Sequence, residues 1–206
     1  MNDRDKLIES LNKLAINPTS SQVAACDTYI NNLAKWQKKI NLVGASTLDV
    51  PYTRHILDAA QLVPRVPRGT LLDVGSGAGI PGLILSIFLD NQITLCERNT
   101  KKTSFLNDMV RKLNLQEKCH IISKNVEGIN QNYDIITGRG VTNLSNFLYL
   151  TYQQRHHATL YIVQKGKSVC EELEAAQNHW QFSSKIVNSI VNSDSNILFL
   201  SNVEKK

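Results

Sequence analysis

Apolar positions recur at two different spacings along this chain, and the spacing changes near residue 64. Before that point they return every three or four positions, as on one face of an α-helix. The pattern predicts helices over residues 3–14, from a cap at Thr19 or Ser20 to about residue 39, and over residues 52–62. Residues 64–69, PRVPRG, interrupt regular structure because they contain two prolines and a glycine. We therefore expect a helical extension over residues 1–63 and a second domain over residues 64–206.

In the second domain, short apolar runs alternate with segments of helical spacing. Strands are predicted over residues 70–74, 92–97, 119–123, 133–137 and 159–164, and helices over residues 81–90, 100–114, 143–154 and 168–179. Strands that alternate with helices form a mostly parallel sheet with helices on both faces. Two further apolar segments, 185–191 and 196–203, flank the turn sequence NSDS and predict a terminal antiparallel hairpin. The expected fold class is α/β.

A glycine-rich loop, LLDVGSGAGIPG over residues 71–82, follows the first predicted strand and precedes a helix. That order places a cofactor at the carboxyl end of a parallel sheet. The dinucleotide fingerprint is excluded because its third glycine position holds Ile80, and no Walker A motif is present. The pattern acid-x-GxGxG, which starts at Asp73 and includes Gly75, Gly77 and Gly79, resembles motif I of class I S-adenosylmethionine-dependent methyltransferases. Carboxylates suit that cofactor, which carries an ammonium and a sulfonium.

Glu97 ends the second predicted strand, 22 residues after Gly75. A carboxylate there can accept hydrogen bonds from both ribose hydroxyls of a nucleoside cofactor. The same acid would also suit NAD, and a surface glutamate at a strand end is the plain alternative. Together with the glycine loop, Glu97 favours S-adenosylmethionine as the cofactor.

Several further stretches together resemble one family. They are WQKKINLVGAST (36–47), RHILDAAQL (54–62), KKTSFL (101–106), NVE (125–127), GRG (138–140) and QKG (164–166). With the glycine loop they are similar to the bacterial ribosomal small subunit methyltransferase G family, also called glucose-inhibited division protein B. The resemblance runs from about residue 5 to the C-terminus. It implies the Rossmann-like fold of class I methyltransferases and methyl transfer from S-adenosylmethionine to guanine nitrogen-7 in the 530 loop of 16S rRNA.

The resemblance also implies a site and a partner, which is 16S rRNA or the small ribosomal subunit. Combined with the loop and strand arguments, it predicts these cofactor-binding residues: Gly75, Gly77, Ile80, Glu97, Val126, Glu127 and Arg139. Two departures stand out. Asn125 occupies a position where the family usually has arginine, and Gly138-Arg139-Gly140 replaces Ser-Arg-Ala. The first change bears on the affinity for the cofactor.

No catalytic general base is expected, because guanine nitrogen-7 already carries an in-plane lone pair. Catalysis then rests on alignment of the two reactants, with Arg139 as a positioning candidate. Cytosine-C5 methylation is excluded since no cysteine follows Pro or Thr. We expect no metal, because the pair His156–His157 lacks partners at ligand spacing and no CxxC pair occurs.

The charge balance is 23 Lys+Arg against 18 Asp+Glu, a formal net charge of +5, which permits a nucleic-acid partner without establishing one. No acid occurs between Asp134 and Glu171. Basic residues predicted to contact RNA are Lys165, Arg54, Lys38 and Lys39. Aromatic Trp36 and Tyr52 are interpreted as anchors of the extension rather than as base-stacking residues.

Neither a membrane-spanning run nor a signal peptide is predicted, so the expected location is the cytoplasm. Two alternatives remain open. One is a methyltransferase with the same donor site and a non-RNA substrate. The other is a non-catalytic RNA-binding or ribosome-assembly factor on a decayed methyltransferase fold, for which Asn125 is the best support.

Overall fold

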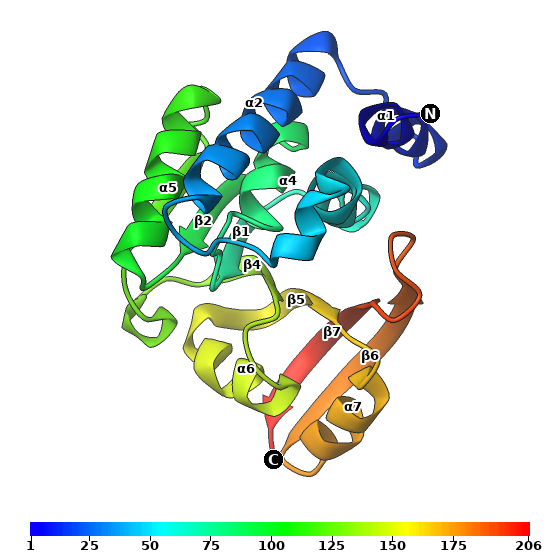
Figure 1. Ribbon diagram of the computed structural model, residues 1–206. Coiled ribbons are helices and arrows are strands. Elements are labelled where there is room, and N and C mark those ends of the chain that lie inside the picture. The colour runs from blue at the N-terminus through cyan, green and yellow to red at the C-terminus, as the bar shows by residue number, and fades with distance from the viewer.

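A seven-stranded sheet forms the centre of the computed structural model, which describes residues 1–206 (Figure 1). The strand order is β3-β2-β1-β4-β5-β7-β6. The strands are β1 Thr70–Val74, β2 Gln92–Cys96, β3 Cys119–Ile122, β4 Tyr133–Arg139, β5 Arg155–Lys165, β6 Trp180–Asn188 and β7 Asn196–Lys205. Strands β1 to β5 pair in parallel, and β7 runs antiparallel to both of its neighbours. The predicted α/β fold with a terminal antiparallel hairpin is confirmed.

Helices cover both faces of this sheet. The α-helices are α1 Asp3–Lys13, α2 Ser20–Gln37, α3 Asp58–Ala60, α4 Gly82–Phe88, α5 Thr100–Lys112, α6 Leu144–Thr151 and α7 Val169–Gln177. Short turns of other helical types are η1 Ala45–Leu48, η2 Tyr52–Leu57, η3 Val63–Arg65, η4 Val126–Gly128 and η5 Tyr152–Gln154. Side chains of α6 and α7 belong to one core cluster, and those of α1 to α5 belong to the other. Adjacent strand residues point to opposite faces, so Leu71 lies in the larger cluster and Leu72 in the smaller one.

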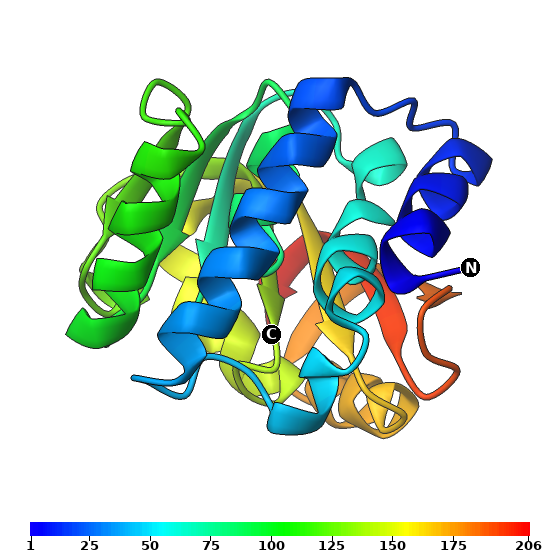
Figure 2. The same cartoon turned by 45° about the horizontal axis from the view of Figure 1, so that its top comes forward.

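The N-terminal helices lie on the face of the sheet that α4 and α5 cover (Figure 2). A capping box at Thr19 begins α2, as the sequence predicts. The indole of Trp36 donates to Asp108 Oδ2 at 3.1 Å and packs edge-on against Phe105, which confirms Trp36 as an anchor of the extension. Residues 1–63 share the larger core cluster with the sheet, and their treatment as a separate extension stays a prediction.

Two predicted elements differ from the structure. The first strand of the hairpin, β6, begins at Trp180 rather than at residue 185. It lies at the edge of the sheet with most residues exposed or half-exposed, so it lacks a regular apolar pattern, and pairing with β7 determines its length. The predicted helix over residues 52–62 is wound as a π-helix in η2 before it continues as α3.

No helix in the structure combines the length and the apolarity needed to cross a membrane.

Candidate active site

The glycine loop turns sharply over the carboxyl end of β2. Gly75, Gly77 and Gly79 all have positive φ, at 67°, 55° and 79°, a region that residues with a Cβ adopt only under strain. The backbone N–H groups of Gly75 and Ser76 both donate to the carbonyl of Cys96, at 2.8 and 3.1 Å. A Cβ on Gly75 would lie 3.1 Å from a methyl of Val141. Glycine is therefore required by conformation and by space.

Asp73 supports this loop from beneath. Its Oδ2 accepts from the backbone N–H of Gly82 at 3.1 Å, and its carbonyl accepts from the Ser76 hydroxyl at 2.9 Å. The side chain is fully buried, and burial raises the pKa of the Asp73 carboxyl to about 7. Its second oxygen has no hydrogen-bond partner. Asp73 thus joins the start of the loop to the start of α4.

Glu97 holds the centre of the loop. One carboxylate oxygen accepts from the N–H of Gly77 at 3.0 Å, and the other accepts from the N–H of Asn99 at 2.8 Å. Glu97 is itself buried, with 7% of its surface exposed. Each carboxylate oxygen accepts more than one hydrogen bond, so acceptor capacity remains on both oxygens.

A pocket of about 400 Å³ opens beside Glu97, between the ends of β1, β2 and the segment after β3. We call it the donor pocket. The residues that line it are Val74, Gly75, Cys96, Glu97, Arg98, Lys102, Lys124, Asn125, Val126, Glu127, Val141, Thr142 and Leu150. Four of the predicted cofactor-binding residues therefore come together here: Gly75, Glu97, Val126 and Glu127.

Three other predicted cofactor-binding residues do not line the donor pocket. Ile80 directs its side chain into the larger core cluster and is only 4% exposed, because it follows the last glycine of the loop and packs beneath it. Gly77 does not line the pocket itself, but its N–H donates a hydrogen bond to Glu97, which does. Arg139 lies across the segment 140–142 from the donor pocket. Cofactor contacts by these three residues stay predictions.

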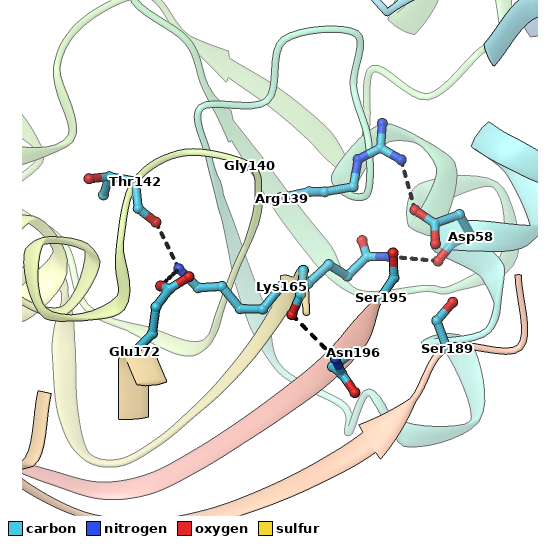
Figure 3. Close-up of a pocket in the computed structure, with 11 residues that line it drawn as sticks. Asp58, Arg139, Gly140, Thr142, Lys165, Glu172, Ser189, Ser195 and Asn196 are labelled. Atoms are coloured by element: carbon cyan, nitrogen blue, oxygen red, sulfur yellow. Dashed lines mark hydrogen bonds and ion pairs between the residues drawn. The ribbon is translucent and has the colours of Figure 1, made fainter. Parts of the chain in front are cut away.

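Arg139, at the end of β4, pairs with Asp58 of α3. Its guanidinium donates to Asp58 Oδ2 at 2.7 Å (Figure 3). It also donates to the carbonyl of Arg54 at 3.4 Å. Two further pockets, of about 260 and 290 Å³, meet at this ion pair, since both are lined by Asp58, Arg139 and Ser195. Thr142 lines the first of these and also the donor pocket, so the two spaces adjoin.

The predicted RNA-contacting residues are spread around this rim. Lys165 is 9% exposed, and its ammonium donates to the Thr142 carbonyl and to Glu172 Oε2, both at 2.7 Å (Figure 3). Its charge is thereby neutralised inside the protein, which favours a role in shaping the pocket wall. Arg54 lines the 290 Å³ pocket, and Lys38 and Lys39 are exposed where α2 ends. RNA contact by these four residues stays a prediction.

Sequence reasoning missed Tyr29, which ties α2 to the glycine loop. Its hydroxyl donates to the carbonyl of Ala78 at 2.8 Å, and the side chain is fully buried. Gln164, at the end of β5, was missed as well, although it stands within the QKG stretch. Its amide nitrogen donates to the carbonyl of Asp58 at 2.9 Å. The local sequence carries no signal for either contact, because each partner lies far along the chain.

His55 is buried beside the Arg139–Asp58 pair and is neutral. Burial, together with the charges of Arg139 and Arg54, lowers the pKa of its imidazole to about 4. The Thr47 hydroxyl, 3.1 Å from His55 Nε2, also donates to the carbonyl of Gly44, so Nε2 carries the imidazole proton. His55 Nδ1 is then an acceptor without a partner.

No group of three or more His, Cys, Asp or Glu side chains is arranged to hold a metal ion. The four cysteines are free, and three of them are buried.

Known proteins resemble this chain in sequence and in fold. The family model described as rRNA small subunit methyltransferase G matches residues 22–199. A protein named ribosomal RNA small subunit methyltransferase G from Methylobacterium nodulans is 34% identical in an alignment that covers 98% of this chain and 96% of that protein. The protein of the same name from Rhizorhabdus wittichii is 35% identical in an alignment that covers 81% of this chain and 79% of its own.

Among solved structures, ribosomal protein L11 methylase from Lactobacillus delbrueckii subsp. bulgaricus superposes with a TM-score of 0.58. Its sequence identity is 15%, over 70% of this chain and 78% of that one. The TYW2 protein of M. jannaschii, solved in complex with S-adenosylmethionine, superposes with a TM-score of 0.52 at 13% identity, over 68% of this chain and 70% of its own. These likenesses identify the fold as that of the class I S-adenosylmethionine-dependent methyltransferases. By the match of its sequence over most of its length, the chain belongs to the rRNA small subunit methyltransferase G family.

Proposed function

We propose that this protein transfers a methyl group from S-adenosylmethionine to nitrogen-7 of a guanine in the 530 loop of 16S rRNA. The observation that carries the proposal is the donor pocket, where a positive-φ glycine loop meets a buried carboxylate whose oxygens retain acceptor capacity. Membership of the family supports the substrate, since relatives matched over most of this chain are named for the small-subunit rRNA. Small ribosomal subunits are assembled in the cytoplasm, and we infer that location for the protein.

The residues of the donor pocket fit S-adenosylmethionine on two structural grounds. A Cβ at position 75 would reduce the space beside the loop, and glycine has none. The backbone can therefore approach a ligand closely at this position. Glu97 offers acceptors for the two ribose hydroxyls, and we infer that the adenine packs against Val126 and Glu127, which line the same pocket. Asn125 also lines this pocket, so the residue that departs from the family pattern faces the proposed cofactor.

When bound, S-adenosylmethionine supplies an electrophilic methyl on its sulfonium. The protein has to hold the guanine so that nitrogen-7 lies in line with that methyl, which is catalysis by orientation. No side chain needs to remove a proton, because nitrogen-7 carries none. This agrees with the weak basicity of His55, whose pKa is lowered to about 4, and with the pairing of Arg139 by Asp58.

The test uses radiolabelled S-adenosylmethionine with small ribosomal subunits, or 16S rRNA, that lack this methyl group. We expect one labelled guanine in the 530 loop, located by strand cleavage at methylated nitrogen-7. The Gly75→Val variant should bind no donor and transfer no label, because the backbone has a positive φ at this position and the new side chain would meet Val141. Donor binding without labelled RNA would point to the non-RNA methyltransferase, and no donor binding by the natural protein would favour the decayed-fold alternative.

A further inference from the structure

A wholly polar pocket of about 260 Å³ lies beside Arg139, and none of its 11 lining residues is hydrophobic (Figure 3). We call it the polar pocket. Its walls come from α3, from the ends of β4 and β5, and from the β6–β7 turn. The lining residues are Asp58, Arg139, Gly140, Thr142, Gln164, Lys165, Gly166, Glu172, Ser189, Ser195 and Asn196. A pocket with this lining recognises its ligand by hydrogen bonds rather than by apolar contact.

The charges of the polar pocket cancel within it. Asp58 pairs with Arg139 at 2.7 Å, and Glu172 pairs with Lys165 at 2.7 Å. These four are its only charged side chains, so the lining has no formal net charge. A site for a phosphate would carry surplus positive charge. The polar pocket therefore suits an uncharged ligand with its own donors and acceptors, such as a nucleobase.

Asp58 and Gln164 bring unused hydrogen-bond acceptors to the polar pocket. Oδ2 of Asp58 accepts from Arg139 and Oδ1 accepts from Gln61 at 3.1 Å, which leaves further acceptor capacity on both oxygens. The Gln164 amide nitrogen is fixed by its bond to the Asp58 carbonyl, so the orientation of this amide is determined. Gln164 Oε1 then remains buried without any donor. Asp58 and Gln164, which both line the pocket, thus each carry an acceptor with spare capacity.

We propose that the polar pocket receives the target guanine and that Asp58 and Gln164 accept its N1–H and 2-amino hydrogens. This inference rests on the proposed function. Guanine is the RNA base that presents two adjacent donors on its Watson–Crick edge, whereas adenine and cytosine present a ring-nitrogen acceptor there. An enzyme that acts on an extruded base reads it by hydrogen bonds to that edge.

The position of the polar pocket agrees with attack from nitrogen-7. Nitrogen-7 lies on the side of the purine opposite the 2-amino group, so a guanine held by Asp58 directs nitrogen-7 away from α3. The segment 140–142 and the donor pocket lie in the neighbouring space, since Thr142 borders both pockets. Gly140, which lines the polar pocket in this segment, has a positive φ of 64°, and a Cβ there would meet nothing within 4 Å.

The experiment compares guanosine with inosine, which lacks only the 2-amino group, at the target position of reconstituted small subunits. For the natural protein we expect kcat/KM on inosine to fall at least tenfold. A site built to bond a polar group rejects an analogue that lacks it, because its own groups are left unpaired. For Asp58→Asn we expect kcat/KM on guanosine to fall at least tenfold, and the ratio of kcat/KM on guanosine to kcat/KM on inosine to become smaller. Gln164→Leu should have the same two effects. Gln164→Glu keeps an acceptor and should still discriminate between guanosine and inosine.

Two controls separate reading of the base from indirect effects. Asp27→Asn removes a carboxylate from another arginine pair, Arg4–Asp27 at 2.8 Å, outside all three pockets, and should leave the ratio unchanged. Titration of S-adenosylmethionine alone should give the same affinity for Asp58→Asn as for the natural protein. If Asp58→Asn bound S-adenosylmethionine more weakly and left the guanosine-to-inosine ratio of kcat/KM unchanged, Asp58 would act on the donor through Arg139. That result would overturn the inference.

The remaining outcomes distinguish this inference from the proposed function. Equal rates on guanosine and inosine by the natural protein would overturn the role of the polar pocket and leave the methyltransferase assignment standing. No methylation of the guanosine particle would overturn both.

Discussion

Glutamine in place of Glu97 tests whether one carboxylate both holds the glycine loop and binds the donor. In the structure its two oxygens accept from the N–H groups of Gly77 at 3.0 Å and Asn99 at 2.8 Å. Glutamine has one oxygen and an NH₂ group that cannot accept, so one of these N–H groups loses its partner. A hydrogen bond to a charged group contributes about 1.5–3 kcal/mol. We expect Glu97→Gln to lower the free energy of unfolding by about that amount.

The same change should weaken donor binding. The ribose hydroxyls would meet one neutral oxygen instead of a carboxylate, which removes or weakens at least one charge-assisted hydrogen bond. Since about 1.4 kcal/mol corresponds to a tenfold change in affinity, Kd for S-adenosylmethionine should rise by about 10- to 100-fold. Urea denaturation measures the first effect, and isothermal titration calorimetry of the donor measures the second.

Glu127→Gln is the matched control, because Glu127 lines the same pocket, is exposed and makes no hydrogen bond through its carboxylate. Its unfolding free energy should stay within about 0.5 kcal/mol of the natural protein's. An unchanged unfolding free energy for Glu97→Gln would refute its role in holding the loop. A lowered unfolding free energy with unchanged donor affinity would refute its role in binding the ribose.

Three further predictions concern other contacts of the site. Tyr29→Phe leaves the carbonyl of Ala78 without a donor and should lower the unfolding free energy by about 1–3 kcal/mol in urea, with weaker donor binding. Gly82→Ala should destabilise by about 1–3 kcal/mol in the same assay, because its Cβ would lie 2.6 Å from atoms of β1 and β2, whereas Gly166→Ala meets nothing and should not. The buried His55 has a pKa of about 4, below its ordinary 6.5, so unfolding takes up a proton between those values. The contribution of His55 to the free energy of unfolding should therefore be constant above pH 6.5 and fall by up to about 3 kcal/mol as the pH drops to 4. The buried carboxyl of Asp73, whose pKa is raised to about 7, contributes a dependence of opposite sign over much of that range, so the contribution of His55 is measured as the difference between the unfolding curves of the natural protein and His55→Gln; the same pH dependence in both would contradict it.

The parts of the fold predicted from sequence are those whose pattern is local. Strand β1 begins and ends where the sequence predicts, and α5 covers Thr100–Lys112, because each has an apolar face that repeats at its own period. Edge strand β6 has Trp180 buried but mostly exposed residues after it, and only its pairing with β7 reveals its start. The regular spacing of apolar residues arises because one face of an element is buried. An element with few buried residues therefore shows no such spacing in its sequence.

The same reasoning divides the site. The donor half could be predicted because its parts follow one another within one strand-loop-helix-strand unit, and Gly77 and Glu97 are only 20 residues apart. The arrangement of the polar pocket could not, because its contacts join distant segments: Asp58 meets Arg139 across 81 residues, and Gln61 meets Ser189 across 128. No spacing rule connects such positions before the strand order is known.

The winding of η2 determines where the side chains of His55 and Asp58 lie. In an α-helix these two residues lie one turn apart on one face and would face the same neighbours. In the structure the N–H of Asp58 bonds to the carbonyl of Thr53, five residues back, which is the π-helical pattern. The imidazole consequently bonds to Thr47, while the carboxylate reaches Arg139 at the end of β4. Such turns occur frequently at functional sites, and this one carries Asp58 to the place where the polar pocket and the 290 Å³ pocket meet.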